Sequence, residues 1–375
     1  MNPVRVMIVR STSSYGGPER QIIGFARRLD PGEFSVVVCG FSEGNPLLLA
    51  AAECGLETAV IPASKGFDTS GIRCLARLLT ELGIDLVCPQ DYRANVYALL
   101  AGRHAGLPVV ATAHGYTKHT LRVRLYECLD RFLLCRADRI VCVSEALRRR
   151  LRRWGIPEAR LCRVYNSVDV GKIGRQPPTE LRDTRPIVCS VGRLSVEKGH
   201  RFLVKAWPHV LERVPQARLV LVGDGPERGK LMSLSSDLGI ASFVEFVGFV
   251  DNAMDYVKSC RVFALPSVTE GLPVALLEAG AAGKPAVASN VGGVGEVVQS
   301  SRTGILIRPG RSDELAEAIC WLLTHPEAAG KMGVHARQAV EAKFCYERNV
   351  PVLREVYLSA LGSRRFADPL LRIAG

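Results

Sequence analysis

The chain has 375 residues, a length that predicts two or three domains of ordinary size. Hydrophobic residues make up 47 % of the sequence, and no apolar run reaches the roughly 18 residues of a membrane span, as is typical of a globular α/β protein. A polar loop follows the first apolar run, which indicates a strand rather than a signal peptide. The twelve cysteines are scattered without a C-x-x-C pair, so we expect reduced thiols in the cytoplasm and no zinc site.

The formal net charge of +12 lies mostly in the first half of the chain. Residues 1–175 hold 25 lysines and arginines against 16 acidic residues, and many of these arginines fall in two predicted helices. A basic helix that ends in tryptophan suits an anionic membrane surface or an anionic acceptor. A solvated basic face is the alternative. The arginines are Arg122, Arg124, Arg131 and Arg136 in the first helix, and Arg148, Arg149, Arg150, Arg152 and Arg153 before Trp154 in the second.

Strands and helices alternate through the first half, and near-continuous apolar runs such as V-V-V-C predict parallel strands buried on both faces. Gly16 and Gly17 separate the first strand from the first helix, where backbone could approach a ligand closely. The pattern G-G-x-x-R is not the G-x-G-x-x-G fingerprint of dinucleotide-binding proteins. We expect strands at 4–10, 34–39, 57–61, 85–88, 108–112, 139–143 and 161–164, and helices at 18–29, 46–54, 71–82, 94–102, 121–135 and 145–154.

His114 follows directly on the strand at 108–112. Ligands of open parallel sheets bind at the carboxyl ends of the strands, so this histidine is a candidate site residue. A lone histidine is also often purely structural.

The composition shifts at 171–186, where Pro177 and Pro178 interrupt any apolar period, and we place a domain linker there. The alternation then begins again. We expect strands at 186–191, 217–222, 243–246, 261–265, 286–289 and 304–307, with helices at 200–214, from about 272, and at 312–323, 326–343 and 347–361. Two doubly wound halves of this kind usually hold a ligand in the cleft between them.

The stretch S-V-T-E-G-L-P-V-A-L-L-E-A-G-A-A-G at 267–283 places Glu270 in a loop and Glu278 inside an apolar helix. A carboxylate in such surroundings is costly unless it has a partner. The N–H groups of residues 271–274 would point out of the start of this helix, which favours an anion there. A ligand with a phosphate between two sets of hydroxyls, such as a nucleotide sugar, fits two carboxylates beside an anion site. Alternatively, Glu270 caps the helix and Glu278 makes an ion pair in the core.

Arg193 and Lys198 flank the turn after the strand at 186–191, where ligands of a parallel sheet bind. An arginine fork and a lysine point charge suit a diphosphate leaving group. Each residue alone is more often a surface cation, and we favour the phosphate role when both are taken together with Glu270, Glu278 and the helix from about 272.

These motifs together resemble the retaining glycosyltransferases of family 4. The resemblance covers essentially the whole chain, and the ordered set of motifs is far more specific than any one of them. It comprises G-G-x-x-R at 16–20, H-G at 114–115, N-S-V-D at 166–169, G-R-L-S-V-E-K-G, V-G-D-G-P-E, E-G-L-P-V-A-L-L-E-A-G-A-A-G-K-P-A-V-A-S and G-G-V-G-E-V-V.

The resemblance implies a GT-B fold with two Rossmann-like domains facing a central cleft, an α/β architecture. The acceptor domain would span 1–172, the nucleotide-sugar domain 173–345, and a last helix at 346–375 would return to the first domain. It also implies a donor site without a metal, since no D-x-D motif is present.

Carried over by motif, the expected catalytic residues are Glu270, His114, Arg193 and Lys198. Arg193 and Lys198, with Gly192, would bind the donor diphosphate, and Glu278 would bind the ribose. Glu270 would hydrogen-bond the transferred sugar, and His114 would lie beside it. The backbone at Gly271, Leu272 and Val274 would add to the phosphate site, and Gly16 and Gly17 would lie against the donor phosphates or the acceptor.

The implied reaction moves a sugar from a UDP-sugar, or second a GDP-sugar, to a hydroxyl of a glycan or lipid-linked acceptor with retention. Bacterial surface polysaccharide assembly on the inner face of the membrane is the expected setting. A nucleotide-sugar epimerase of the same fold is the alternative. A nucleic-acid binder is less favoured, because the arginines lack interleaved aromatic residues and no binding motif is present.

Overall fold

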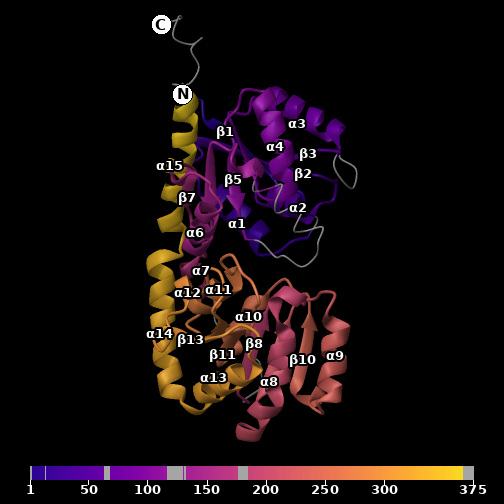
Figure 1. Cartoon of the computed structure of the whole chain (residues 1–375), viewed down its shortest axis with the longest axis vertical. Coiled ribbons are helices and arrows are strands. Elements are labelled where there is room, and N and C mark those ends of the chain that lie inside the picture. The colour runs from indigo at the N-terminus through magenta and orange to yellow at the C-terminus, as the bar shows by residue number, and fades with distance from the viewer. Residues whose placement is uncertain are drawn as a thin grey trace, which may run out of the picture. The chain divides into compact units, whose positions relative to one another are not determined.

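The structure is a computed structural model that describes residues 2–12, 14–62, 68–115, 130, 132–175 and 185–365. The chain divides into two compact units. Unit 1 comprises Met1–Asn166 and Tyr346–Gly375, and unit 2 comprises Ser167–Cys345 (Figure 1).

Unit 1 contains a parallel sheet in the order β3-β2-β1-β4, and a second one in the order β5-β6-β7. A parallel bridge from Val87 to Val109 continues the first sheet into the second. The strands are β1 (Val4–Val9), β2 (Phe34–Gly40), β3 (Glu57–Val60), β4 (Leu86–Pro89), β5 (Val110–Ala113), β6 (Arg139–Cys142) and β7 (Leu161–Arg163). The helices are α1 (Gly17–Ala26), α2 (Pro46–Glu53), α3 (Thr69–Glu81), α4 (Tyr92–His104), α6 (Glu145–Arg153), the short 3-10 helix η1 (Glu158–Arg160) and α15 (Tyr346–Arg365).

The last helix belongs to unit 1, as expected from the sequence. Figure 1 shows α15 beside the strands of unit 1, and it contacts α1, β5 and β6. Its apolar residues Leu353, Val356, Tyr357 and Ala360 are buried in the core of that unit. A chain that has passed through unit 2 therefore completes the core of unit 1.

Unit 2 contains a six-stranded parallel sheet in the order β10-β9-β8-β11-β12-β13. Its strands are β8 (Ile187–Val191), β9 (Arg218–Val222), β10 (Val244–Gly248), β11 (Val262–Leu265), β12 (Ala286–Ser289) and β13 (Gly304–Ile307). Its helices are α7 (Val170–Arg175), α8 (His200–Arg213), α9 (Arg228–Asp237), α10 (Ala253–Ser259), α11 (Val274–Ala281), α12 (Val294–Val297), α13 (Ser312–Thr324) and α14 (Pro326–Lys343), with 3-10 turns η2 (Val196–Lys198) and η3 (Ala241–Phe243).

The strand order reverses between β1 and β4 in unit 1 and between β8 and β11 in unit 2. Such a switch point opens a crevice at the carboxyl ends of the two strands, where doubly wound proteins bind their ligands. The loops after β1, β4, β8 and β11 are therefore the places to look for a site.

Unit 1 ends at Asn166, a few residues before the boundary expected after residue 172. Val168 forms a parallel bridge with Cys345, and its N–H donates to the Phe344 carbonyl at 2.9 Å, which ties the segment after Asn166 to unit 2. The expected linker at 171–186 begins inside α7, which contacts α11.

Four helices of unit 2 were not expected from the sequence: α7, α9, α10 and α12. In α9 only Leu231 and Ser235 are buried, so no apolar stripe of helical period marks it. The other three have seven residues or fewer. The helix expected at 121–135 falls mainly outside the described residues.

Candidate active site

Lys198 and Glu270 meet at the switch point of unit 2. Lys198 ends the turn η2 after β8, and Glu270 lies in the loop after β11. The Lys198 Nζ lies 2.8 Å from Glu270 Oε1, and the Ser267 hydroxyl donates to the same oxygen at 2.7 Å. The Glu270 side chain is only 8 % exposed, whereas that of Lys198 is 26 % exposed.

Two glycines allow the neighbouring loops to approach this pair. Gly199 has a φ of 66°, and a Cβ there would lie 2.1 Å from the Pro266 carbonyl oxygen. Gly292 has a φ of 53°, and a Cβ there would lie 1.8 Å from the Glu270 carbonyl oxygen. Only glycine fits both the left-handed backbone and the close approach, so these residues fix where Glu270 is held.

Backbone hydrogen bonds lock the same loops together. The Val268 N–H donates to the Glu197 carbonyl at 2.8 Å, and the Gly293 N–H donates to the Gly271 carbonyl at 2.8 Å. The loops after β8, β11 and β12 are thus joined through one short segment, 268–271. A site on joined loops at strand ends is held more rigidly than one on an isolated loop.

Gly192 and Arg193 continue directly from β8. The Gly192 N–H donates to the Val222 carbonyl at 2.9 Å, and Gly223 lies so close that a Cβ on it would be 2.1 Å from the Gly192 carbonyl oxygen. The Arg193 side chain is exposed, and none of the described residues forms an ion pair with it. The structure therefore joins Lys198 to Glu270 and leaves the Arg193 guanidinium outside that pair.

The helix of the central stretch begins at Val274, two residues later than expected, with Pro273 as its cap. Proline in this position lacks an N–H, and the first N–H groups of the helix are those of Val274 and Ala275. The Leu276 N–H donates to the Pro273 carbonyl at 3.1 Å. The amides that face outward at the helix start are therefore those of Val274 and Ala275, rather than the expected set 271–274. Glu278 is half-buried one turn into this helix.

Glu270 is not the N-cap residue of α11, because that position is Pro273. Among the described residues, the Glu270 carboxylate bonds Lys198 and Ser267.

A second polar cluster lies at the switch point of unit 1, and the sequence had not indicated it. Arg10, directly after β1, is 8 % exposed and pairs with the buried Glu19 at 2.9 Å. Glu19 also accepts from the Gly16 N–H at 2.9 Å and from the Thr12 hydroxyl at 3.0 Å. The amide of Gly16 is therefore already occupied, while Gly17 begins α1.

This cluster extends to His114 through Gln90. Arg10 Nη1 donates to the Gln90 carbonyl at 2.6 Å, and Gln90 Oε1 lies 2.9 Å from His114 Nε2. Burial, and then the positive charge of Arg10, lower the pKa of His114 to about 3. The ring is therefore neutral at pH 7.

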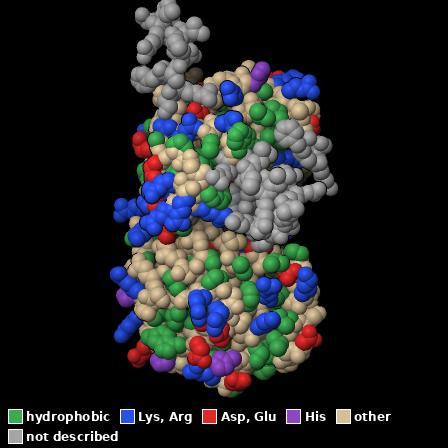
Figure 2. Space-filling model, in the orientation of Figure 1, with side chains coloured by type: hydrophobic (Ala, Val, Ile, Leu, Met, Phe, Trp, Pro, Cys, Tyr) green, Lys and Arg blue, Asp and Glu red, His purple; other side chains and the backbone are tan. Residues whose placement is uncertain are grey.

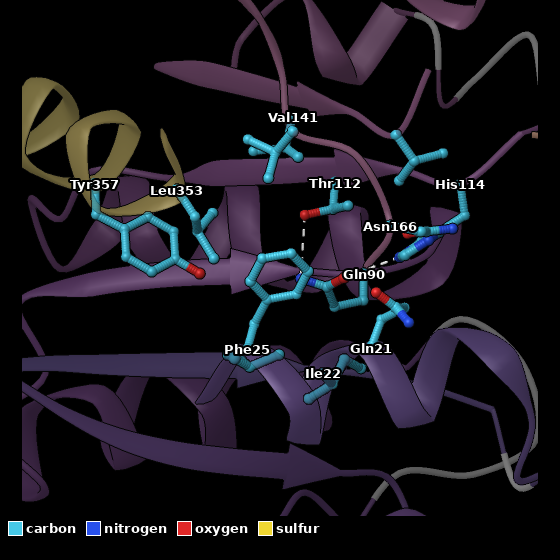
Figure 3. A pocket seen from close by; sticks show the side chains of 13 residues that line it. Gln21, Ile22, Phe25, Gln90, Thr112, His114, Val141, Asn166, Leu353 and Tyr357 are labelled. Carbon is cyan, nitrogen blue, oxygen red and sulfur yellow. Dashed lines mark hydrogen bonds between the residues drawn. The ribbon is translucent and has the colours of Figure 1, made fainter. Parts of the chain in front are cut away.

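His114 lies at one end of a cavity of about 40 Å³ inside unit 1. Figure 3 shows Gln21, Gln90, Asn166 and His114 at the polar end, and Phe25, Leu353 and Tyr357 at the apolar end. The walls come from α1, the strand ends and α15. The last helix of the chain therefore forms part of the environment of His114.

The basic helix α6 is exposed on unit 1, and Figure 2 shows lysine and arginine side chains gathered where α6 lies. Several of its charges are paired: Arg148 bonds Glu145 and Glu158, and Arg152 lies 3.1 Å from Glu158. The Arg150 guanidinium stacks 4.7 Å above the Trp154 ring. Arg122, Arg124 and Arg131 lie outside the described residues.

No group of three or more His, Cys, Asp or Glu side chains in the described part of the chain could hold a metal ion. Within the same residues, no helix has both the length and the apolar character that crossing a bilayer requires.

We expect stability to fall in mild acid because two buried histidines stay neutral in the folded state. Burial lowers the pKa of His114 to about 3 and that of His200 to about 4, from an ordinary 6.5. Between pH 6.5 and those values the unfolded chain binds the extra protons, so stability rises with pH, by about 1.4 kcal/mol per pH unit for each histidine. Urea denaturation at pH 7, 6 and 5 measures this. In a His200→Gln variant the dependence should weaken, whereas it should persist in His209→Gln, an exposed histidine on the same helix whose pKa Glu317 raises.

Comparison with known proteins agrees with this geometry. The family model described as "Glycosyltransferase Family 4" matches residues 15–172, and the one described as "Glycosyl transferases group 1" matches residues 175–339. A GDP-mannose-dependent alpha-(1-6)-phosphatidylinositol monomannoside mannosyltransferase of Mycobacterium tuberculosis is 34 % identical over 292 residues, 73 % of this chain and 75 % of that protein. The chain belongs to glycosyltransferase family 4.

A further relative and two solved structures extend the comparison. The alpha-D-kanosaminyltransferase of Streptomyces kanamyceticus is 29 % identical over 73 % of this chain and 76 % of its own length. The solved structure of Anabaena HepE in complex with UDP superposes with a TM-score of 0.84 at 22 % identity, covering 95 % of this chain and 100 % of that one. Sucrose-phosphate synthase from Thermosynechococcus elongatus gives 0.85 at 20 % identity, covering 96 % and 100 %. The fold is GT-B, and the protein is a glycosyltransferase.

Proposed function

We propose that this glycosyltransferase is a retaining enzyme that takes a sugar from a UDP- or GDP-sugar and transfers it to a hydroxyl of a glycan or lipid-linked acceptor. The observation that carries the proposal is the Lys198–Glu270 pair at the switch point of β8 and β11. A cation and a carboxylate held together at that point can bind a diphosphate and the sugar next to it.

The site residues predicted in unit 2 each have a role in this proposal. Lys198 and Arg193 neutralise the diphosphate in place of a metal ion, since Arg193 is exposed and unpaired among the described residues. The amides of Val274 and Ala275 at the start of α11 add two donors. Glu278 binds the ribose hydroxyls, and Glu270 accepts hydrogen bonds from the transferred sugar.

In the proposed reaction the bond between the anomeric carbon and the phosphate oxygen breaks while the acceptor hydroxyl attacks from the same face. The new bond joins the acceptor oxygen to the anomeric carbon, and the departing phosphate takes the hydroxyl proton. The protein contributes positioning and charge stabilisation, the two terms that dominate where the chemistry needs no protein nucleophile.

The named relatives support two donor nucleotides. The Mycobacterium tuberculosis enzyme is named for GDP-mannose, and Anabaena HepE was solved with UDP, with UDP-glucose, and with UDP and glucose. UDP remains our first choice and GDP the second. The lipid acceptor in the name of the mycobacterial enzyme fits a lipid-linked acceptor and a place in surface polysaccharide assembly.

We place the protein in the cytoplasm, with the basic face of α6 against the inner face of the membrane. Arg153 is exposed and has no ion pair among the described residues, and Arg150 lies against Trp154, an arrangement suited to anionic headgroups. Flotation with anionic liposomes at low salt tests this. If the protein does not float with the liposomes, the proposed membrane association through α6 is wrong.

We expect one nucleoside diphosphate to raise the melting temperature selectively. A ligand at 100 times its Kd stabilises the folded state by about 2.7 kcal/mol, which for a domain of this size is a shift of roughly 5–10 °C. The panel is UDP, GDP and ADP with their sugars, measured by thermal unfolding of the full chain. ADP serves as a control for non-specific phosphate binding. If no nucleotide or nucleotide sugar shifts the melting temperature, the donor site is assigned to the wrong residues.

A further inference from the structure

Gln90 is the central residue of the polar cluster in unit 1. It follows β4 directly, is 7 % exposed, and its backbone is fixed at both ends, since its N–H donates to the Val9 carbonyl at 2.9 Å and its carbonyl accepts from Arg10. Its side chain reaches across to the neighbouring strand β5, where Nε2 donates to the Thr112 hydroxyl at 3.1 Å. This contact leaves Oε1 facing His114 Nε2 at 2.9 Å.

The orientation of the Gln90 amide decides where the proton of His114 resides. An amide oxygen can only accept, so His114 Nε2 must carry the hydrogen, and Nδ1 of the neutral ring then carries a lone pair. His114 Nδ1 is buried and has no hydrogen-bond partner among the residues that the structure describes. A buried polar atom without a partner is costly, and a ligand or an ordered water can supply the missing hydrogen bond.

The charge next to Gln90 keeps the His114 ring neutral. Arg10, whose own charge is offset by Glu19, lies beside Gln90 and disfavours a second proton on the imidazole. Figure 3 shows the ring at the polar end of the cavity, together with Asn166 and Gln21. The only hydrogen bond that His114 can add without protonation is one that it accepts at Nδ1.

We propose that Gln90 is a positioning residue that holds His114 in the Nε2–H tautomer, so that Nδ1 accepts a hydrogen bond from a hydroxyl of the sugar substrate. The second half of this statement rests on the proposed glycosyl transfer. The first half concerns the protein alone and can be tested without any substrate.

The tautomer is measured on the full chain labelled with 15N in its histidine rings, because 15N shifts distinguish a protonated from an unprotonated ring nitrogen. A His114→Asn variant assigns the signal among the seven histidines. We expect Nε2 protonated and Nδ1 unprotonated in the wild type. Gln90→Leu should give a mixture of tautomers, whereas Gln90→Glu, which still offers an acceptor, should restore the Nε2–H form at neutral pH.

Gln21→Leu is the matched control, because it makes the same substitution in the same cavity and Gln21 does not bond His114. It should leave the tautomer unchanged. A proton on Nδ1 in the wild type, or an unchanged tautomer in Gln90→Leu, overturns the positioning role.

The substrate contact is tested with deoxy analogues of the accepted donor and acceptor sugars. A site that bonds a hydroxyl rejects the analogue that lacks it. We expect one deoxy position to lower kcat/KM at least 10-fold in the wild type and less than threefold in Gln90→Leu. Equal losses in both enzymes at every position would refute the contact at Nδ1. If the wild type turns over no nucleotide sugar at all, the proposed function fails while the tautomer result stands.

Discussion

Replacing Lys198 by alanine is expected to lower turnover about 10²–10³-fold at saturating donor. The estimate corresponds to the loss of one preorganised group that stabilises developing negative charge, here on the departing diphosphate. Lys198 is held in place for this by Glu270 at 2.8 Å, and Glu270 in turn by Ser267 at 2.7 Å. Because the variant leaves a nearly buried carboxylate with one partner fewer, we also expect a loss of about 1–3 kcal/mol in stability.

Turnover must therefore be measured well below the melting temperature of the variant, with the fraction folded checked by circular dichroism. Lys205→Ala is the control, because Lys205 is an exposed lysine on α8 in the same unit with no role in the proposal. It should retain wild-type turnover. A folded Lys198→Ala enzyme with a kcat within twofold of the wild type would show that Lys198 serves only as the partner of Glu270.

Central strands such as β1, β2 and β11 were predictable because they are buried on both faces, which produces short apolar runs. Every strand expected from the sequence is present, and its ends agree within two residues. The helices that escaped prediction lack this signal. In α9 polar residues dominate, and only Leu231 and Ser235 are buried.

The donor half of the site was predictable because its residues are close in sequence to strand ends. Lys198 and Glu270 each follow a strand of a parallel sheet, and adjacent parallel strands bring such residues together. The partner of Glu270 could not be read from the sequence, since pairing depends on how near Gly199 and Gly292 let two loops approach. Spacing gives the edge of the sheet on which a residue lies but not its contacts.

The network around His114 could not be predicted for a different reason. Arg10, Glu19 and Gln90 lie on separate segments, and each alone reads as an ordinary polar residue near a strand or at a helix start. Their significance comes from burial at the β1–β4 switch point, where the charge of Arg10 must be compensated. No spacing rule connects residues that meet only through the fold.

The second large effect is expected when a glycine of the donor site is replaced. We expect Gly292→Ala to destabilise unit 2 by about 3 kcal/mol or more and to abolish donor binding. The left-handed backbone at a φ of 53° costs an alanine about 1 kcal/mol. The new Cβ would also lie 1.8 Å from the Glu270 carbonyl oxygen, so the loop that carries Glu270 must move. Displacing a catalytic loop by about 1 Å can cost roughly 10²-fold in rate.

Variants at two other glycines of unit 2 distinguish backbone strain from the steric clash. Gly239 has a φ of 70°, and no atom lies within 4 Å of the position that a Cβ would take, so Gly239→Ala tests backbone strain without a clash. Gly229 has neither feature, and alanine inside α9 should be neutral or stabilising. Melting temperatures of the three variants should therefore fall in the order Gly229→Ala, Gly239→Ala, Gly292→Ala, and donor binding should be lost only in Gly292→Ala. If Gly292→Ala binds donor as Gly239→Ala does, the loop at Glu270 tolerates displacement, and the donor site does not depend on the close approach of the β12 loop.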